Sequence, residues 1–379
     1  MKKENDFYTY HYDISKIILR FHTKYLVTIC LAELIFLSIM GLYYPSLKWK
    51  SIMLGKKSSI SLLSVVALII WGVSIWWGWM PNAYNVKIQT AETAKINNHE
   101  MVSGYITTST LIDITDWLIN KPGGLLSNDI TPPGVLMDNM PAFEYGVLEQ
   151  ARDLALAMRL SFSRSQSQST GDKDLEIGQS KLNISHKSWQ LPSAENEYAG
   201  AIKALKRYRS RLISKTATDA QFYTRADNLG DWLREVEKRL GSISHRLSAS
   251  VGHDRFNTAL SGDPTAKQST ETALEVMVKT SWWKIDDVFY ESRGATWAIL
   301  HFLKAVEIDF ADVLEKKNAQ ASLKQIIRDL ESTQDAIWAP MILNGSGFSL
   351  LANHSLVMAN YVSRANAALI DLRRLLEQG

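Results

Sequence analysis

Residues 217–251 read ATDAQFYTRADNLGDWLREVEKRLGSISHRLSASV, and apolar positions in this stretch recur at alternating steps of three and four residues. A mean step near 3.5 residues is the spacing of the buried seam between helices that pack as in a coiled coil. Charged residues such as Glu235 and Lys238 occupy the other faces. The stretch therefore predicts an amphipathic helix in a helical bundle. Its seam consists of Phe222, Ala226, Leu229, Leu233, Val236, Leu240, Ile243 and Leu247.

A similar pattern closes the chain, and the segments between the two patterns predict further helices. These segments are a Trp-rich stretch at 281–290, then 295–314 and 321–338. Pro340 ends this run, and the sequence NGSG at 344–347 predicts a turn. No sustained strand alternation occurs, so the sequence predicts an all-α fold with long, coiled-coil-like helices. The C-terminal seam consists of Met358, Tyr361, Ala365, Ala368, Leu372 and Leu375.

Residues 60–80, ISLLSVVALIIWGVSIWWGWM, form an apolar stretch without a charged residue. Its 21 residues are close to the roughly 20 that a helix needs to cross a bilayer. Trp76, Trp77 and Trp79 lie near its end, as is typical of a membrane–water interface. The stretch predicts a transmembrane anchor, followed by a soluble helical domain at 81–379.

A second apolar stretch, 26–44, lies within the N-terminal extension 1–59. Glu33 near its middle opposes insertion, whereas the surrounding Leu, Ile and Phe residues favour it. A single span at 60–80 would place the main domain away from the cytoplasm, because the preceding segment 45–59 is rich in lysine. Two spans would form a hairpin with the main domain in the cytoplasm. The residues leave both topologies open.

The bulk composition excludes several classes of site. With 42 basic and 39 acidic residues, the net charge of +3 opposes a nucleic-acid binder. Cys30 is the single cysteine and lies in an apolar stretch, so no intrachain disulfide can form. The histidines lack a metal-binding spacing such as HExxH, and no phosphate-binding glycine motif occurs. The sequence therefore predicts no metal and no cofactor.

Two stretches are less regular than the helices. The first, 121–141, reads KPGGLLSNDITPPGVLMDNMP, and Pro132 and Pro133 each fix φ and remove a backbone donor. It predicts a rigid loop. The second, 163–190, begins with SRSQSQS and is largely polar, so it predicts a surface linker.

Five strings in this chain closely resemble the bacterial domain-of-unknown-function family 2333. The resemblance covers the chain from about Gly78 to its C-terminus, whereas the first ~45 residues depart from the family. It implies an inner-membrane protein with one N-terminal anchor, a helical periplasmic domain and no assigned activity, so no catalytic residue carries over. The strings are KPGGLLSND, PPGVLMDNMP, SRSQSQS, WQLPSAENEY and AQFYTRADNLGDWLREVEKRLGSISHRLSASVG.

Carboxylates and arginines near the loop offer two chemistries. Paired carboxylates within 129–153 would suit an envelope hydrolase, and arginines would suit a phosphate or carboxylate clamp. Turn capping, helix solvation and ion pairing are the simpler interpretations of the same residues. The candidate cleft or interaction residues are Asp129, Asp138, Asn139, Glu144, Arg152, Asp153, Arg164, Arg225 and Asp227.

The function that this sequence favours is that of a membrane-anchored interaction or scaffold protein of the bacterial envelope. The expected partners are the lipid bilayer and either an envelope protein or a second copy of the chain. A hydrolase with a carboxylate site and a cytoplasm-facing adaptor are the alternatives. The long helices, the near-neutral charge and the missing site signatures favour the interaction protein over an enzyme.

Overall fold

A computed structural model describes residues 56–165, 171–214, 219–256, 275–339, 341–346, 348 and 350–378. Two units are distinguished by their internal contacts. The first contains the chain up to Trp79 together with Asp129–Met137, and the second contains Met80–Asn128 and the chain from Asp138 onward. The prediction of a first membrane segment at 26–44 lies outside the described residues.

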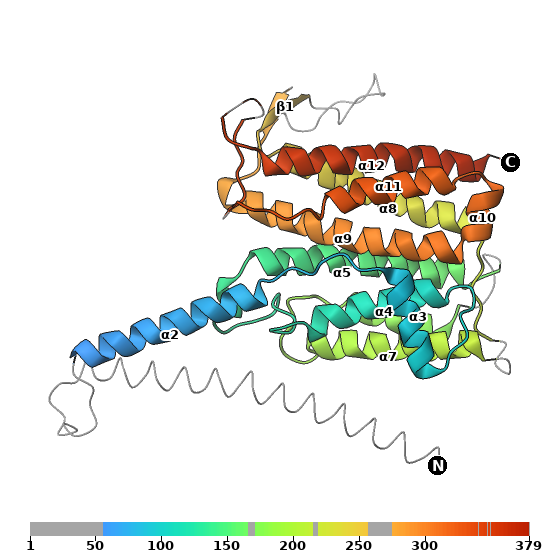
Figure 1. Ribbon diagram of the computed structural model, residues 1–379, viewed down its shortest axis with the longest axis horizontal. Helices are drawn as coiled ribbons and strands as arrows, with labels where there is room; N and C mark the ends of the chain where they lie inside the picture. The colour runs from blue at the N-terminus through green and yellow to red at the C-terminus, as the bar shows by residue number, and fades with distance from the viewer. Residues whose placement is uncertain are drawn as a thin grey trace, which may run out of the picture. The chain divides into compact units, whose positions relative to one another are not determined.

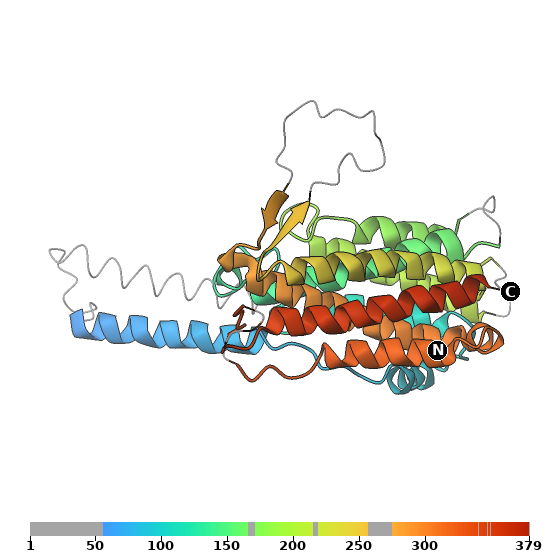
Figure 2. The ribbon, with the colours of Figure 1, turned by 90° about the horizontal axis from the view of Figure 1, so that it is seen from above.

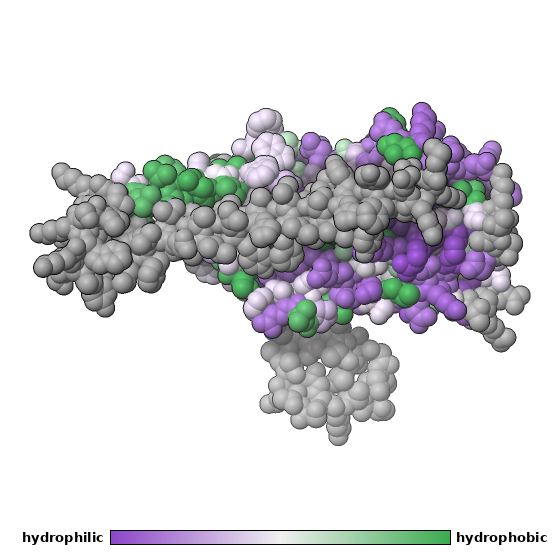
Figure 3. Space-filling view, turned by 90° about the horizontal axis from the view of Figure 1, so that it is seen from below, coloured by the Kyte–Doolittle hydropathy of each residue, from purple (hydrophilic) through white to green (hydrophobic). Residues whose placement is uncertain are grey.

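The first unit contains helix α2 (Lys56–Trp77) and the 3-10 turn η1 (Gly134–Leu136). No helix of the described residues combines the length and the apolarity needed to cross a membrane, so the transmembrane anchor predicted at 60–80 is wrong. The helix ends at Trp77, which leaves 18 helical residues (60–77) of the predicted 21. Hydrophobic side chains are nevertheless exposed along α2 (Figure 3).

The second unit is organised around two helices in direct contact, α5 (Asn139–Ala157) and α9 (Ile285–Asp309). A Cβ at Gly146 would overlap the backbone of Glu291, and a Cβ at Gly294 would overlap the backbone carbonyl of Phe143. Each glycine therefore lets the other helix approach with backbone against backbone. Close approach of this kind requires a residue without a side chain.

The remaining helices pack on both sides of this pair (Figure 1). Helices α4, α6 and α7 form one layer with α5, and α8, α11 and α12 form the other with α9. Their bounds are α3 (Val86–Asn97), α4 (Tyr105–Asn120), α6 (Lys173–Leu182), α7 (Ala194–Ile213), α8 (Ala226–Ser248), α10 (Ala311–Lys316), α11 (Gln320–Ser332) and α12 (His354–Glu377). A π-helical turn, η2 (Met158–Phe162), continues α5, and a 3-10 turn, η3 (Trp282–Lys284), precedes α9.

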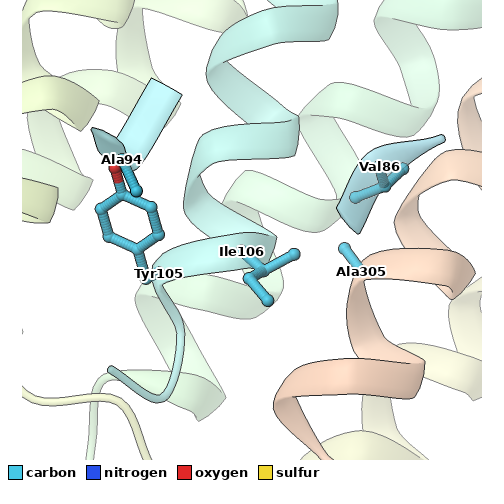
Figure 4. Close-up of a cluster of buried hydrophobic side chains, with 5 residues drawn as sticks. All are labelled: Val86, Ala94, Tyr105, Ile106 and Ala305. Atoms are coloured by element: carbon cyan, nitrogen blue, oxygen red, sulfur yellow. The ribbon is translucent and has the colours of Figure 1, made fainter. Parts of the chain in front are cut away.

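Helix α3 joins α4 and α9 through a small buried cluster (Figure 4). Its members are Val86, Ala94, Tyr105, Ile106 and Ala305. The start of α4 is held by the last residue of α9: Asp309 Oδ2 accepts hydrogen bonds from Thr107 N and Thr107 Oγ1, both at 2.7 Å. Gly104, the residue before α4, has φ +82° and no capping side chain of its own. Asp309 therefore caps a helix distant in sequence.

Helix α8 confirms the predicted seam from Leu229 to Leu247, since all six apolar positions of that part are buried. Phe222 and Ala226 are only partly buried, because Phe222 precedes the helix and Ala226 is its first residue. In α12 three of the six predicted seam positions, Met358, Ala365 and Leu372, are buried. The other three are only partly buried, and the next residue along the chain is buried in place of each: Val362, Leu369 and Leu376. The all-helical prediction thus holds for the bundle, and the seam predicted on α12 is confirmed at half of its positions.

Two further elements differ from the sequence expectations. Helix α6 lies inside the stretch 163–190 predicted as a polar linker, and Leu175 and Leu182 anchor it in the core. A two-stranded antiparallel hairpin, β1 (His253–Phe256) with β2 (Glu275–Val278), interrupts the helices. Its four-residue strands are too short to leave a clear alternation in the sequence.

Candidate interaction surface

Glu144 is buried in the bundle rather than placed in a cleft. Its Oε1 lies 2.6 Å from Lys121 Nζ, and the two side chains are 1% and 2% exposed. The same carboxylate accepts hydrogen bonds from the backbone N–H groups of Leu126 and Ser127, each at 2.9 Å. Lys121 Nζ also donates to Gly124 O at 2.6 Å. The carboxylate is saturated by these donors and holds the KPGGLLS segment on α5.

Arg152 and Asp153 follow each other on α5 but have separate partners. Arg152 donates to the carbonyls of Leu182 and Ile184, both at 2.7 Å, at the end of α6. A guanidinium at this position complements the negative end of a helix dipole. Asp153 forms two bonds with Arg239 of α8, at 2.6 and 3.0 Å. Burial raises the pKa of Asp153, and the hydrogen bond from Arg239 opposes that shift.

Arg239 and its ion-pair partner Glu149 border a small cavity of about 50 Å³ between α5, α8 and α9. Tyr145, Glu149 and Gln150 line it from α5, and Arg246 faces it from α8. Glu149 contacts Arg239 at 3.1 Å, and Arg246 binds Glu291 through two bonds of 2.8 Å. The charges here neutralise one another, so the arrangement suits an ion-pair network that joins three helices.

Asp138 and Asn139 lie at the beginning of α5. Asp138 is the N-cap residue, and its Oδ1 accepts a hydrogen bond from Asn139 N at 2.9 Å. Asp129 belongs to the first unit, where its carboxyl packs against Gly134 so closely that a Cβ at that position would overlap it. Capping and turn formation account for these residues.

The last candidates lie where the chain enters α8. Arg225 forms a bidentate pair with Asp227, at 3.0 and 2.7 Å, and also donates to Ser165 O at 3.0 Å. Both side chains of the pair are more than half exposed. Arg164 follows η2, and its backbone N donates to Ser161 O at 3.4 Å. The ion-pair interpretation of Arg225 and Asp227 is the one that the geometry matches.

Glu144 and Asp153 do not face a common cleft. Glu144 and Asp153 are nine residues apart on α5, which corresponds to about 13 Å along the axis and to opposite faces of the helix. A glycosidase-type pair needs roughly 5–10 Å. Among the described residues, no group of three or more His, Cys, Asp and Glu side chains is arranged to hold a metal ion.

A different feature stands out on the surface of the second unit. The beginnings of α9 and α12 and the β1–β2 hairpin lie at the same end of the bundle (Figures 1 and 2). Large apolar side chains of these segments and of the connection that leads into α12 are exposed. Their exposed fractions run from 60% for Leu351 to complete exposure for Phe348. We call this set the apolar end. It consists of Phe256, Met277, Trp282, Trp283, Trp338, Met341, Phe348, Leu350 and Leu351.

The two main segments of the apolar end are held together at their bases. Phe289, on the first turns of α9, contacts the ring of His354 at the start of α12, with 6.5 Å between centroids. His354 Nδ1 accepts a hydrogen bond from Leu343 N at 2.9 Å. Asn353 caps α12 by accepting from Leu356 N at 2.9 Å, and it donates to Gly345 O at 2.5 Å. These bonds fix both ends of the connection between Leu343 and α12.

Sequence reasoning missed this surface, although signals for it were present. Trp282 and Trp283 were assigned to a helix, whereas they lie in η3 before α9 begins. The stretch 336–353 contains no Asp, Glu, Lys, Arg or His, which is unusual for a connection between two helices. A search for long uncharged loops would have identified it.

Comparison with known proteins gives one match. A family model described as an uncharacterized protein conserved in bacteria (DUF2333) matches residues 47–379. No curated protein and no solved structure matches the chain. The matched region includes every helix of the bundle and confirms the resemblance inferred from the five strings. The chain therefore belongs to the bacterial domain-of-unknown-function family 2333.

Proposed function

We propose that this protein is an α-helical interaction protein that acts as a scaffold and makes contact through its apolar end. The observation that supports the proposal is the concentration of exposed Trp, Phe, Leu and Met side chains on one end of the second unit. Contiguous exposed apolar patches on folded domains generally mark contact surfaces. Tryptophan is moreover enriched among the residues that dominate binding energy.

The polar candidates support the same proposal by their structural roles. Glu144, Arg152 and Asp153 each have partners that join helices or cap them. Glu144 in particular already accepts bonds from Lys121 and from backbone N–H groups on a nearly inaccessible carboxylate, an environment unlike that of a catalytic acid or base within reach of a substrate. A scaffold needs a rigid body and a contact surface, and the bundle with its apolar end supplies both.

The proposal is tested by site-specific photo-crosslinking in cells. A photoreactive amino acid replaces Trp283 or Phe348 in the apolar end, and Ile96 on α3, itself 84% exposed, serves as the matched control. We expect discrete adducts, with protein or with lipid, from positions 283 and 348 but not from position 96. Equal yields at all three positions, or none at 283 and 348, would refute a contact surface at the apolar end.

A further inference from the structure

We infer that the apolar end inserts into the headgroup region of a zwitterionic phospholipid bilayer. The inference rests on the proposed function, because it names the partner of that surface. Contact of this kind occurs at the bilayer surface and requires no spanning helix.

The shape of the apolar end favours a flat partner over a peptide or a helix. Its most exposed residues, Phe348, Leu350 and Trp338, lie on irregular segments rather than in a groove. The depression between α6 and α7, of about 390 Å³, and the smaller cavity beside Arg239 are both lined by charged residues. Neither includes a residue of the apolar end. Peptide and helix ligands dock into grooves, whereas protruding side chains can enter a lipid surface.

The side-chain chemistry fits the boundary between headgroups and acyl chains. Trp282, Trp283 and Trp338 each combine a large apolar ring with one N–H donor, the combination that concentrates tryptophan at membrane interfaces. Phe348 and Leu350 supply purely apolar tips on the same loop system. Insertion would remove all of these side chains from water together.

The charge pattern selects a zwitterionic rather than an acidic surface. The stretch 336–353 is uncharged, and the stretch 279–287 carries two lysines (Lys279, Lys284) and two aspartates (Asp286, Asp287), a net charge of zero. Binding to acidic lipid depends on clusters of several lysines or arginines. Insertion at the apolar end should therefore depend little on ionic strength.

The base of the loop gives the surface a fixed form. Asn344 and Asn353 pair in an isolated antiparallel bridge, and Asn353 at the same time caps α12. The segment that carries Phe348 is thus attached to the end of a 24-residue helix. Ordering the base of the loop before contact lowers the entropic cost of binding.

The test uses the purified full-length chain with Cys30→Ser and one engineered cysteine carrying a nitrobenzoxadiazole label. The label is placed at F348C, at W283C in a second preparation, and at I96C as the control. We expect addition of phosphatidylcholine vesicles to shift the emission of the first two labels to the blue, equally at low and at ~0.5 M salt. The label at position 96 should not respond. W282A/W283A should lower vesicle partitioning of the F348C chain by at least about tenfold.

Two results would overturn the inference. The first is unchanged emission at both 283 and 348, even if the chain sediments with the vesicles through another segment. The second is a shift only with acidic vesicles that disappears at high salt. Failure of the lipid inference is distinguishable from failure of the proposed function. In the former case positions 283 and 348 still crosslink in cells, to protein; in the latter they do not crosslink at all.

Discussion

Lys121 and Glu144 form an ion pair almost wholly removed from water, with 2.6 Å between Nζ and Oε1. Removing one partner of such a pair leaves an uncompensated buried charge, which costs about 3–5 kcal/mol. We therefore expect Lys121→Met or Glu144→Gln to lower the free energy of unfolding, measured in urea, by roughly that amount. The amide that replaces the carboxylate can still accept a bond from Leu126 N–H, so the double variant should recover much of the loss. Strictly additive losses would show that the two side chains are not coupled.

The contact between α5 and α9 predicts opposite effects for glycine substitutions. Gly146→Ala and Gly294→Ala each place a methyl group against backbone of the facing helix, and we expect each to destabilise the fold by about 2 kcal/mol or more. Gly230 on α8 is the matched control, because a Cβ there meets nothing within 4 Å. Gly230→Ala should raise stability by roughly 0.5–1 kcal/mol. Thermal unfolding of the three variants checks the sign, and stabilisation by G146A would contradict the described packing.

His301 makes stability depend on pH. Its Nδ1 donates to Trp297 O at 2.6 Å and its Nε2 accepts from Tyr84 N at 3.1 Å, so the buried ring is neutral. Burial lowers the pKa of His301 to about 4. Because the unfolded state binds the proton more readily, the stability from the neutral ring is complete above pH 6.5 and is lost as pH falls towards 4.

The difference in unfolding free energy between the wild type and H301N isolates this effect. We expect the difference to fall by at most ~1.4 kcal/mol per pH unit between pH 6.5 and 4. Burial raises the pKa of Asp113 to about 6, which gives the opposite slope, but Asp113 is present in both proteins and cancels. A difference that stays flat from pH 7 to 4 would exclude the described role of His301.

Asp309 provides the cap that α4 lacks in its own sequence. Asp309→Ala removes the acceptor for Thr107 N and Oγ1, and we expect a loss of about 1–2 kcal/mol in unfolding free energy. Asp312, exposed in the first turn of α10, is the matched control and should change stability by less than ~0.5 kcal/mol when replaced by Ala. Faster amide exchange in the first turn of α4 in D309A would locate the effect. Equal losses in both variants would argue against a cap.

The helical fold could be predicted where the spacing of apolar residues within one helix is enough to identify its buried face. The seam from Leu229 to Leu247 lies on a single helix, and its spacing alone specifies the buried face. The membrane anchor predicted at 60–80 was wrong, since no helix of the described residues is both long and apolar enough to cross a membrane. The apolar composition also did not specify the helix end, because α2 ends at Trp77 rather than at residue 80. On α12 three of the six predicted seam positions are buried, and the other three are one residue off, because alanines occupy several faces and give a weak contrast.

The roles of the candidate residues depended on contacts that no local pattern contains. The burial of Glu144 depends on Lys121 across the loop, and the pairing of Asp153 depends on Arg239 of another helix. Arg225 and Asp227, two residues apart, by contrast form a pair that spacing could suggest. To predict the apolar end, one would need to know that η3 and the stretch 336–353 meet at the same end of the bundle. That arrangement depends on how α9 and α12 pack.

The reciprocal placement of Gly146 and Gly294 also bears on how the chain folds during synthesis. The two positions are 148 residues apart (294 − 146), so α5 emerges from the ribosome long before α9. At about 5–20 residues per second, the apolar face of α5 waits roughly 7 to 30 s for its partner. During this interval the face of α5 that meets α9 in the folded protein is not yet covered by that helix.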